Sequence, residues 1–432
     1  MDELGLTLVF LAVLFLFLGS GVWVAVSLIG VATVGMLLFT SRPVGDAMAT
    51  TIWGASSSWT LTALPLFIWM GEILFRTKLS ENLFRGLTPL LHRLPGGLLH
   101  VNIAGCTIFA AISGSSAATV ATVGKMSIPE LRQRNYPERM IVGTLAGAGT
   151  LGLLIPPSIT LIIYGVTVNE SIAQLFIAGI LPGLMLAVLF MGYVAVWGLL
   201  SGHQPAQSGD RSGRLKDVMQ LVPVVLLIAG VMGSIYTGIA TATEAAVLGV
   251  VGALVLSAIQ GSLNKDNFMS ALLGATRTSA MIAFILAGST FLSLAMGFTG
   301  LPRTLAEWIG GLSLSPWMLI FALMIFYIIL GCFLDGISSV VLTMAVIEPL
   351  VRQAGFDMIW FGIFLMVVVE MAQITPPVGF NLFVLQGMTG KDMAFIARAA
   401  VPMFIIMILA VVILSLFPEI ATYLPNVMSG RA

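Results

Sequence analysis

Long apolar runs alternate with short polar segments along almost the whole chain. Most runs approach the roughly 20 apolar residues that a helix needs to cross the hydrocarbon core of a bilayer. They predict helices at residues 4–18, 22–39, 61–75, 140–165, 177–200, 218–236, 245–259, 278–297, 360–385 and 401–417. This pattern predicts an all-α polytopic membrane protein.

Two further apolar stretches, 98–128 and 316–350, are each interrupted near the middle by small polar residues. The first interruption is SGSS, starting at Ser113, and the second is DGISS, starting at Asp335. Neither contains the Lys or Arg typical of a turn in water, so each stretch predicts a re-entrant helical hairpin. Two straight membrane spans are the alternative in each case.

The dipeptide Pro-Pro occurs twice, as Pro156-Pro157 and Pro376-Pro377, and both copies lie inside apolar runs. A proline has no amide proton and its ring clashes with the preceding helical turn. We therefore expect broken helices over 140–165 and 358–387, with carbonyl groups freed at membrane depth. Such carbonyls are tolerated only beside protein, water or a bound ion.

Composition agrees with a membrane protein. Hydrophobic residues make up 58% of the chain, charged residues only 9%, and the mean hydropathy is +1.06. The 19 basic and 19 acidic residues cancel, so no net charge favours nucleic acid. Cys106 and Cys332 have apolar neighbours and no metal-type spacing, which indicates small core residues. Asp2 and Glu3 precede the first apolar run, which favours a retained helix over a signal peptide.

Basic residues test the topology, because cytoplasmic loops are enriched in Lys and Arg. The predicted cytoplasmic loops contain 15 of the 19 basic residues. These loops are 76–93, 125–139, 202–217, 263–277 and 391–398. The assignment requires the first hairpin to enter from the cytoplasm and the second from outside. It also predicts that both termini lie on the outer side of the membrane.

The two halves of the chain share a spacing. Pro129 precedes Pro156 by the same interval by which Pro349 precedes Pro376. One shift along the sequence, from Pro129 to Pro349, therefore superposes both pairs, and we call this shift the repeat offset.

The shared spacing predicts two inverted structural repeats, each with a re-entrant hairpin and a Pro-Pro-broken helix. Residues 1–201 form the first repeat, 202–215 a cytoplasmic linker and 216–432 the second. Inverted repeats with broken helices are typical of secondary transporters, which bind their cargo near the membrane midplane.

The hairpin tips and the breaks supply candidate ligands for a sodium-type cation, which prefers oxygen donors. Each tip is paired with the break of its own half. The first candidate site comprises Ser113, Ser115, Gly152, Ile155 and Pro157. The second, placed mainly by the repeat offset, comprises Asp335, Gly336, Ser338, Ala372, Thr375 and Pro377.

Substrate chemistry is less constrained. The predicted spans contain no buried Lys or Arg, so an anionic solute would depend on helix N-termini, hydroxyl groups and bound cations. The candidate substrate contacts are Gly114, Ser116, Ser158, Ser339 and Asn381.

Several of these residue types have simpler roles. Gly and Ser also allow close helix packing. Asp335 could cap a helix, although a carboxylate at membrane depth costs about 3 kcal/mol on insertion scales. Glu72 is expected to pair with Arg76, and Glu244 to cap a helix. Glu370 is either an interhelical hydrogen-bond acceptor or a proton or ion relay.

The chain resembles the large, DctM-type membrane subunit of TRAP (tripartite ATP-independent periplasmic) transporters. Six runs, in the family's order, support the resemblance: LPLFIWMGEIL (64–74), ISGSSAATVATVG (112–124), GLLIPPSITLIIYG (152–165), LFIAGILPG (175–183), GCFLDGISSVVLTMAVIEPL (331–350) and ITPPVGFNLFVLQG (374–387). They extend over nearly the whole chain and are specific for the family but not for a substrate.

The resemblance implies a sodium-driven importer of a small organic acid in the bacterial inner membrane. Its partners would be a small four-helix membrane subunit of the DctQ type and a periplasmic substrate-binding protein of the DctP type. It also implies an elevator mechanism, in which the hairpins and broken helices slide against a static scaffold. The coupling ion would be Na⁺, at about two sites, and the first would include Ser113, Ser115, Gly152, Ile155 and Pro157.

Three other functions remain open from the sequence. A sodium/divalent-anion symporter would work without a binding protein, and a passive channel would need no sodium gradient. An intramembrane hydrolase could use Ser338 with Asp335, but a serine nucleophile needs a base. The three histidines, His92, His100 and His203, all lie in predicted loop or interfacial positions.

Overall fold

The computed structural model describes residues 12–17, 19–76, 79–201, 218–299, 315–332, 334–376 and 379–430, and all regular elements in these ranges are helices. The first half contains α2 (Val24–Phe39), α3 (Val44–Ser56), η1 (Trp59–Thr62), α4 (Ala63–Phe75), α5 (Leu79–Leu91), α6 (Leu99–Ser113), α7 (Ser116–Gln133), α8 (Glu138–Thr150), η2 (Leu151–Leu153), α9 (Ile159–Val168) and α10 (Ile172–Ser201). The second half contains α12 (Val222–Tyr236), α13 (Ala242–Ile259), α14 (Lys265–Thr299), α16 (Pro316–Gly331), α17 (Gly336–Gln353), α18 (Met358–Gln373), α19 (Phe380–Thr389), α20 (Met393–Leu416) and α21 (Glu419–Met428).

The helices are those of a multi-pass membrane protein. In the described residues, α10, α13, α14 and α20 are long and apolar enough to cross a bilayer. Shorter apolar helices accompany them, and α8 and α18 are buried along nearly their whole length. Because water is absent from a bilayer core, helices are the expected way to pair the backbone groups of these apolar segments.

Helices are more extensive than the apolar runs predict. α3, α5 and α21 were not predicted, and the predicted loop 263–277 is helical from Lys265 onward, where α14 begins. Charged residues such as Lys, Arg and Glu are good helix formers, so a helix can continue past the end of an apolar run. Most of the predicted helix 4–18 and the whole linker 202–215 lie outside the described residues.

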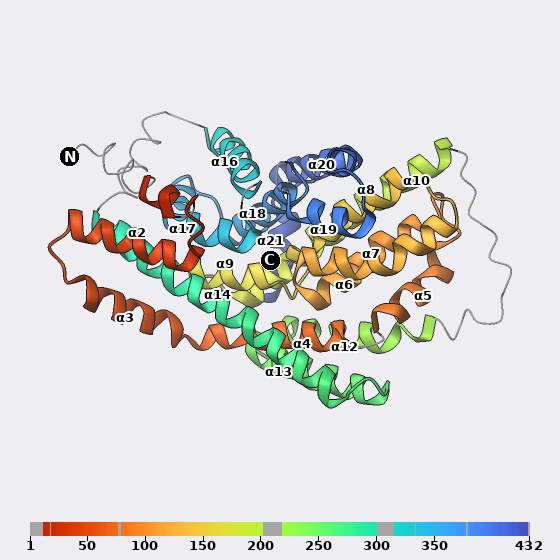
Figure 1. The fold of residues 1–432 in the computed structure, drawn as a ribbon, viewed down its shortest axis with the longest axis horizontal. Coiled ribbons are helices and arrows are strands. Elements are labelled where there is room, and N and C mark those ends of the chain that lie inside the picture. Colours follow the sequence, from red (N-terminus) through yellow and green to blue (C-terminus); the bar gives the residue numbers. More distant parts are fainter. Residues whose placement is uncertain are drawn as a thin grey trace.

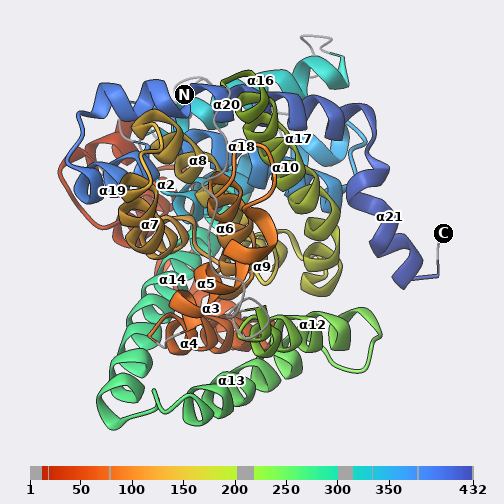
Figure 2. The same ribbon diagram turned by 90° about the vertical axis from the view of Figure 1, so that its right-hand side faces the viewer.

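One group of helices forms a separate layer. α13 packs against α4 and α12, and the long α14 packs against α2, α3 and α4. Figure 2 shows α3, α4, α12 and α13 together below the remaining helices. α13 begins with a capping box, because Thr241 Oγ1 accepts from the Glu244 amide and the Thr241 amide donates to Glu244 Oε2 at 2.8 Å. The predicted capping role of Glu244 is confirmed.

The remaining helices recur at the repeat offset. α7 begins at Ser116 and α17 at the equivalent Gly336, while α8 begins at Glu138 and α18 at the equivalent Met358. The prolines inside α10 and α20, Pro182 and Pro402, are related by the same shift. The described order of each set is therefore a helical hairpin, a helix broken at Pro-Pro, and a long apolar helix (Figure 1).

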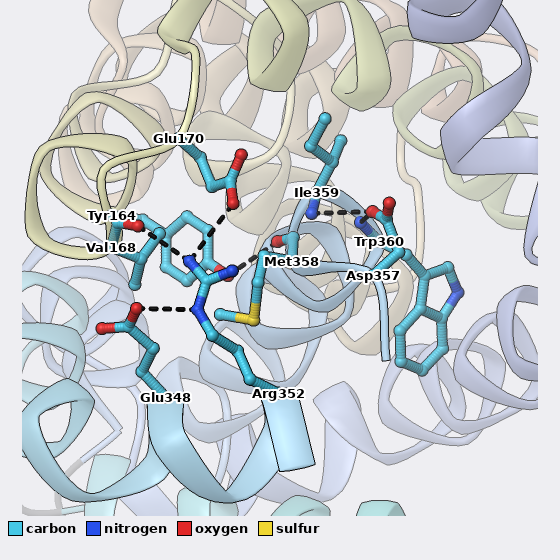
Figure 3. Close-up of polar contacts among 9 residues, drawn as sticks. All are labelled: Tyr164, Val168, Glu170, Glu348, Arg352, Asp357, Met358, Ile359 and Trp360. Carbon is cyan, nitrogen blue, oxygen red and sulfur yellow. Dashed lines mark hydrogen bonds and ion pairs between the residues drawn. The ribbon is translucent and has the colours of Figure 1, made fainter. Parts of the chain in front are cut away.

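The hairpin of each half packs against the broken helix of the other half. α7 lies against α19, and α17 lies against α9. Figure 3 shows one of these junctions, where Arg352 at the end of α17 donates to the Val168 carbonyl at 3.0 Å. Arg352 also forms ion pairs with Glu348 at 2.9 Å and with Glu170 at 3.2 Å. A guanidinium thus binds an orphan carbonyl at the C-terminus of α9, where the helix dipole favours a cation.

A second arginine makes the corresponding contact in the other half. Arg132, at the end of α7, occupies the position equivalent to Arg352 and donates to the Thr389 carbonyl at the end of α19, at 3.3 Å. It also forms an ion pair with Glu138. The two arginines therefore join each hairpin to the half-helix of the opposite repeat, and they do so at equivalent positions.

The Arg352 junction predicts a charge-swap rescue. Arg352→Glu should lower the thermal midpoint of the purified protein in detergent, because a third carboxylate would face Glu170 and Glu348. Adding Glu170→Arg should restore part of the loss, with a coupling free energy of about 0.5–1 kcal/mol, as expected for an exposed ion pair. Differential scanning fluorimetry of the two single variants and the double variant checks this. A double variant no more stable than the sum of the two single changes would contradict the junction.

Candidate functional site

The first Pro-Pro break leaves the Gly152 carbonyl without a donor from its own segment. η2 follows α8, and the Ile155 amide donates to the Leu151 carbonyl at 3.0 Å. Pro156 has no N–H to offer the Gly152 carbonyl four residues before it. The Leu153 carbonyl likewise receives no bond from Pro157, but the buried Ser158 hydroxyl donates to it. Among the described residues of the break, Gly152 therefore retains a carbonyl with no backbone donor.

The tip of the first hairpin is a tight polar turn. α6 ends at Ser113, Gly114 takes the left-handed conformation with φ 58°, and α7 begins at Ser116. Ser113 Oγ lies 2.8 Å from Thr119 Oγ1 and 3.1 Å from the Ser115 carbonyl oxygen. Thr119 was missed from the sequence. Its signal is its place one helical turn after the tip, in an otherwise small and apolar segment.

This tip packs directly onto the first break. A Cβ atom added to Gly152 would lie 2.6 Å from the Ser115 carbonyl carbon and 2.7 Å from the Ser116 amide nitrogen. A Cβ on Gly114 would lie 3.1 Å from the Pro157 carbonyl oxygen. The structure thus brings together Gly114, Ser115, Ser116, Gly152 and Pro157, and only a glycine fits at 152.

Two other predicted residues of this region, Ile155 and Ser158, make contacts with defined neighbours. The side chain of Ile155 packs towards Gly183 of α10, where an added Cβ would lie 2.7 Å from Ile155 Cγ1. Only the backbone of Ile155 is therefore suited to bind a cation. Ser158 is the N-cap of α9, and its Oγ accepts from the Leu161 amide at 3.4 Å.

In the second hairpin, Asp335 caps the N-terminus of α17. Its Oδ2 accepts from the amides of Ile337, at 3.1 Å, and Ser338, at 3.3 Å. The capping role that the sequence offered as an alternative is therefore realised. The carboxylate is exposed, whereas Gly336, Ser338 and Ser339 behind it are buried.

The second break differs from the first. The Thr375 amide donates to the Ala372 carbonyl at 3.1 Å, so this carbonyl has a donor that its counterpart Gly152 lacks. Thr375 Oγ1 donates to the Met371 carbonyl at 2.7 Å. Ala372 and the buried hydroxyl of Ser339 both approach Gly331 of α16. Pro377 lies outside the described residues.

The two hairpin tips approach consecutive residues of the first break. Gly152 touches the first tip, as described above. A Cβ on Gly336 of the second tip would lie 3.0 Å from Leu153 Cδ1 and 3.9 Å from Gln373 Nε2. The first break therefore lies between the two tips, at the centre of the molecule, where α9 is drawn among the other helices (Figure 1).

Several fully or nearly fully buried polar groups of this central region have no hydrogen-bond partner among the described residues. They are the hydroxyls of Thr160 and Ser339, Nε2 of Gln373, Oε2 of Glu370, and both amide atoms of Asn381. Asn381 was a predicted substrate contact, whereas Thr160 and Gln373 were missed. Buried polar atoms without partners are uncommon in proteins, and they mark places where a ligand, an ion or water completes the bonding.

The candidate ligands at the first break are carbonyl and hydroxyl oxygens. Within the described residues, no group of three or more His, Cys, Asp and Glu side chains is close enough to hold a metal ion. A cavity of about 530 Å³ lies elsewhere, between α3–α4 and α14, and Trp69, Leu272 and Ser279 are among its lining residues. The central region can therefore coordinate a hard monovalent cation through carbonyls and hydroxyls, without a buried charged cluster.

Comparisons with known proteins identify the family. Residues 11–420 match the family model described as the DctM component of the tripartite ATP-independent periplasmic transporter. The C4-dicarboxylate TRAP transporter large permease protein DctM of Pseudomonas aeruginosa is 32% identical over 90% of this chain and 92% of its own length. The sialic acid TRAP transporter large permease protein SiaM of Vibrio cholerae is 27% identical over 95% of this chain and 96% of its own length.

A solved structure supports the fold. The YdaH transporter of Alcanivorax borkumensis aligns with 96% of this chain and 98% of its own, with a TM-score of 0.65 and 12% sequence identity. At this identity the likeness concerns the fold alone. The predicted all-α membrane fold and the predicted family are confirmed, and the hydrolase alternative is excluded because the family is a transporter permease and not an enzyme. The chain belongs to the DctM family, the large membrane permeases of tripartite ATP-independent periplasmic transporters.

Proposed function

We propose that this permease imports a small organic acid across the bacterial inner membrane, driven by sodium. The observation that supports it best concerns Gly152: its carbonyl lacks a backbone donor, and the residue packs against the Ser115–Ser116 backbone at the first hairpin tip. A carbonyl oxygen left free at membrane depth is stabilised by a cation, and hydroxyl and carbonyl oxygens lie beside it. Sodium binding would complete the bonding of this break.

Two sodium ions would bind, one beside each hairpin tip. The first would take oxygens of Ser113, Ser115, Gly152, Ile155 and Pro157. The second would take oxygens of Asp335, Gly336, Ser338, Ala372, Thr375 and Pro377. The Ala372 carbonyl keeps a second lone pair after accepting from Thr375, so it can still bind a cation.

The substrate would be a carboxylate or a related acid. Relatives are named for C4-dicarboxylates, sialic acid and isethionate, all of which are acids. The N-termini of α7 and α9 begin beside the first tip and the first break, and their first amides are open to an anion, whereas the N-terminus of α17 is capped by Asp335. Gly114, Ser116, Ser158, Ser339 and the unpartnered Asn381 are the proposed contacts, and the bound sodium ions would offset the negative charge.

The proposed cycle is of the elevator type. The hairpins α6–α7 and α16–α17 and the broken helices α8–α9 and α18–α19 would move together against α2–α4 and α12–α14. A periplasmic binding protein would deliver the acid, and a small four-helix membrane subunit would bind the scaffold. One relative is named a DctMQ permease, and this chain spans 64% of its length. Both termini would be periplasmic.

The proposal predicts a double requirement for uptake. Proteoliposomes containing the chain and its small membrane subunit should accumulate a labelled acid only when the cognate binding protein and an inward sodium gradient are both present. A panel of C4-dicarboxylates, sialic acids and sugar acids identifies the substrate. Uptake that needs sodium but no binding protein would instead indicate a sodium/divalent-anion symporter, and uptake without a gradient would indicate a channel.

Gly152→Ala is predicted to weaken sodium binding. The added Cβ would push the first hairpin tip from the break, and such overpacking costs about 1–3 kcal/mol, or about tenfold in affinity for each 1.4 kcal/mol. The sodium concentration for half-maximal uptake should therefore rise about tenfold or more. Gly192→Ala in α10 is the matched control, since nothing lies within 4 Å of its added Cβ. Equal sodium dependence in the two variants would count against the first site.

A further inference from the structure

Glu370 joins the two broken helices in the centre of the protein. It lies in α18 and is fully buried. Its Oε1 accepts a hydrogen bond from the Leu153 amide at 3.1 Å, across 217 positions of sequence. The neighbouring Leu154 amide also interacts with this carboxylate. The second repeat thus holds the backbone of the first repeat at its break.

The bonded amide belongs to the same peptide group as the Gly152 carbonyl. A trans peptide is planar, so its N–H and C=O point in opposite directions. With the Leu153 N–H directed at Glu370, the Gly152 oxygen is directed away from α18. Glycine adopts more backbone conformations than other residues, so the residue itself does little to hold this orientation.

In the part of the chain that the structure describes, the first repeat offers no equivalent side chain to the second break. The repeat offset relates Glu370 to Thr150, whose hydroxyl donates within its own helix to the Gly147 carbonyl at 2.6 Å. The second break is tightened by its own residue Thr375 instead. Among the described contacts, therefore, only at the first break does a side chain from the opposite repeat orient a free carbonyl.

We infer that Glu370 is a positioning residue for the first sodium site, because its carboxylate fixes the Gly152–Leu153 peptide and thereby the direction of the Gly152 carbonyl, in a residue that packs against the first hairpin tip. The inference rests on the proposed function of that site. Leu153 also touches Gly336 at the second tip, so a displacement of the second hairpin is transmitted to the same peptide. Through its Oε1 contact with the Leu153 amide, Glu370 acts on the direction of a ligand.

Three substitutions separate hydrogen bonding from charge and from packing. Glu370→Met removes the acceptor at similar size, and Glu370→Gln keeps an acceptor oxygen but removes the charge. Val368→Ala truncates a fully buried side chain two residues before Glu370, which places it on another face of the same helix, and it serves as the packing control. Glu370→Asp, which withdraws the carboxylate by one methylene, is the milder variant if Glu370→Met does not fold.

The readout is the rise in thermal midpoint that sodium causes in the protein purified with its small membrane subunit. Sodium is titrated, and choline replaces it to keep the ionic strength constant. Glu370→Met should raise the half-saturating sodium concentration about tenfold or more, the range that positioning residues of metal sites control. Glu370→Asp should shift it in the same direction, and Glu370→Gln should stay close to wild type. In proteoliposomes, saturating sodium should restore uptake by Glu370→Met. Val368→Ala should lower the thermal midpoint without changing the sodium dependence.

The outcomes distinguish this inference from the proposed function. A wild-type protein that gains no stability from sodium would overturn both. If sodium stabilises the wild type but Glu370→Met has the same half-saturating sodium concentration, the positioning role alone is overturned. The same holds for Glu370→Asp if Glu370→Met does not fold. A Glu370→Gln variant as weak as Glu370→Met would also overturn it, because charge rather than the hydrogen bond would then be responsible.

Discussion

The need to satisfy backbone polar groups at the first Pro-Pro break determines much of this structure. An unpaired backbone group in a water-free membrane interior costs several kcal/mol. The break frees two carbonyls, and the protein pairs one with the Ser158 hydroxyl and holds the adjacent amide with Glu370. The first hairpin tip packs against Gly152 so closely that a Cβ atom there would clash with it. Ser158 and Glu370 therefore each have a bonding role at the break, and the Gly152 carbonyl is left without a backbone donor among the described residues.

The same break ties the two repeats into one body. Each hairpin packs against the broken helix of the opposite repeat, and Arg132 and Arg352 bind the carbonyl ends of α19 and α9. Glu370 adds a buried link at the centre. Such crossing contacts mean that neither hairpin can move far without displacing the other repeat's break. This arrangement suits a cycle in which ion binding, tip position and movement of the central helices change together.

Much of the fold could be predicted from the sequence. The apolar runs and the two Pro-Pro pairs gave the positions of the central helices, because two adjacent prolines remove two backbone donors and clash with the preceding turn. The repeat offset recurs in the starts of α7 and α17. α3, α5 and the start of α14 were missed because a search for apolar runs does not detect helices that contain many polar residues. The arginine junctions join residues that no local pattern connects.

The candidate site was predictable only in part. Gly152 followed from proline chemistry, since the carbonyl four residues before a proline loses its donor. The equivalent argument for Ala372 did not foresee that the Thr375 amide would bond it, because that turn tightens locally. Thr119 was missed although it lies one helical turn after the first tip, whereas the contact of Glu370 with Leu153 depends on how the two repeats pack and no local spacing indicates it.

The central claim is that the first break, enclosed by the hairpin tips, is a sodium site. Equilibrium binding of radiolabelled sodium to the purified permease, compared between wild type and Gly152→Ala, tests it most directly. The account predicts saturable binding to the wild type that unlabelled sodium displaces and choline does not, and a marked loss of this binding in Gly152→Ala. Absence of saturable binding in the wild type, or unchanged binding in the variant, would contradict it.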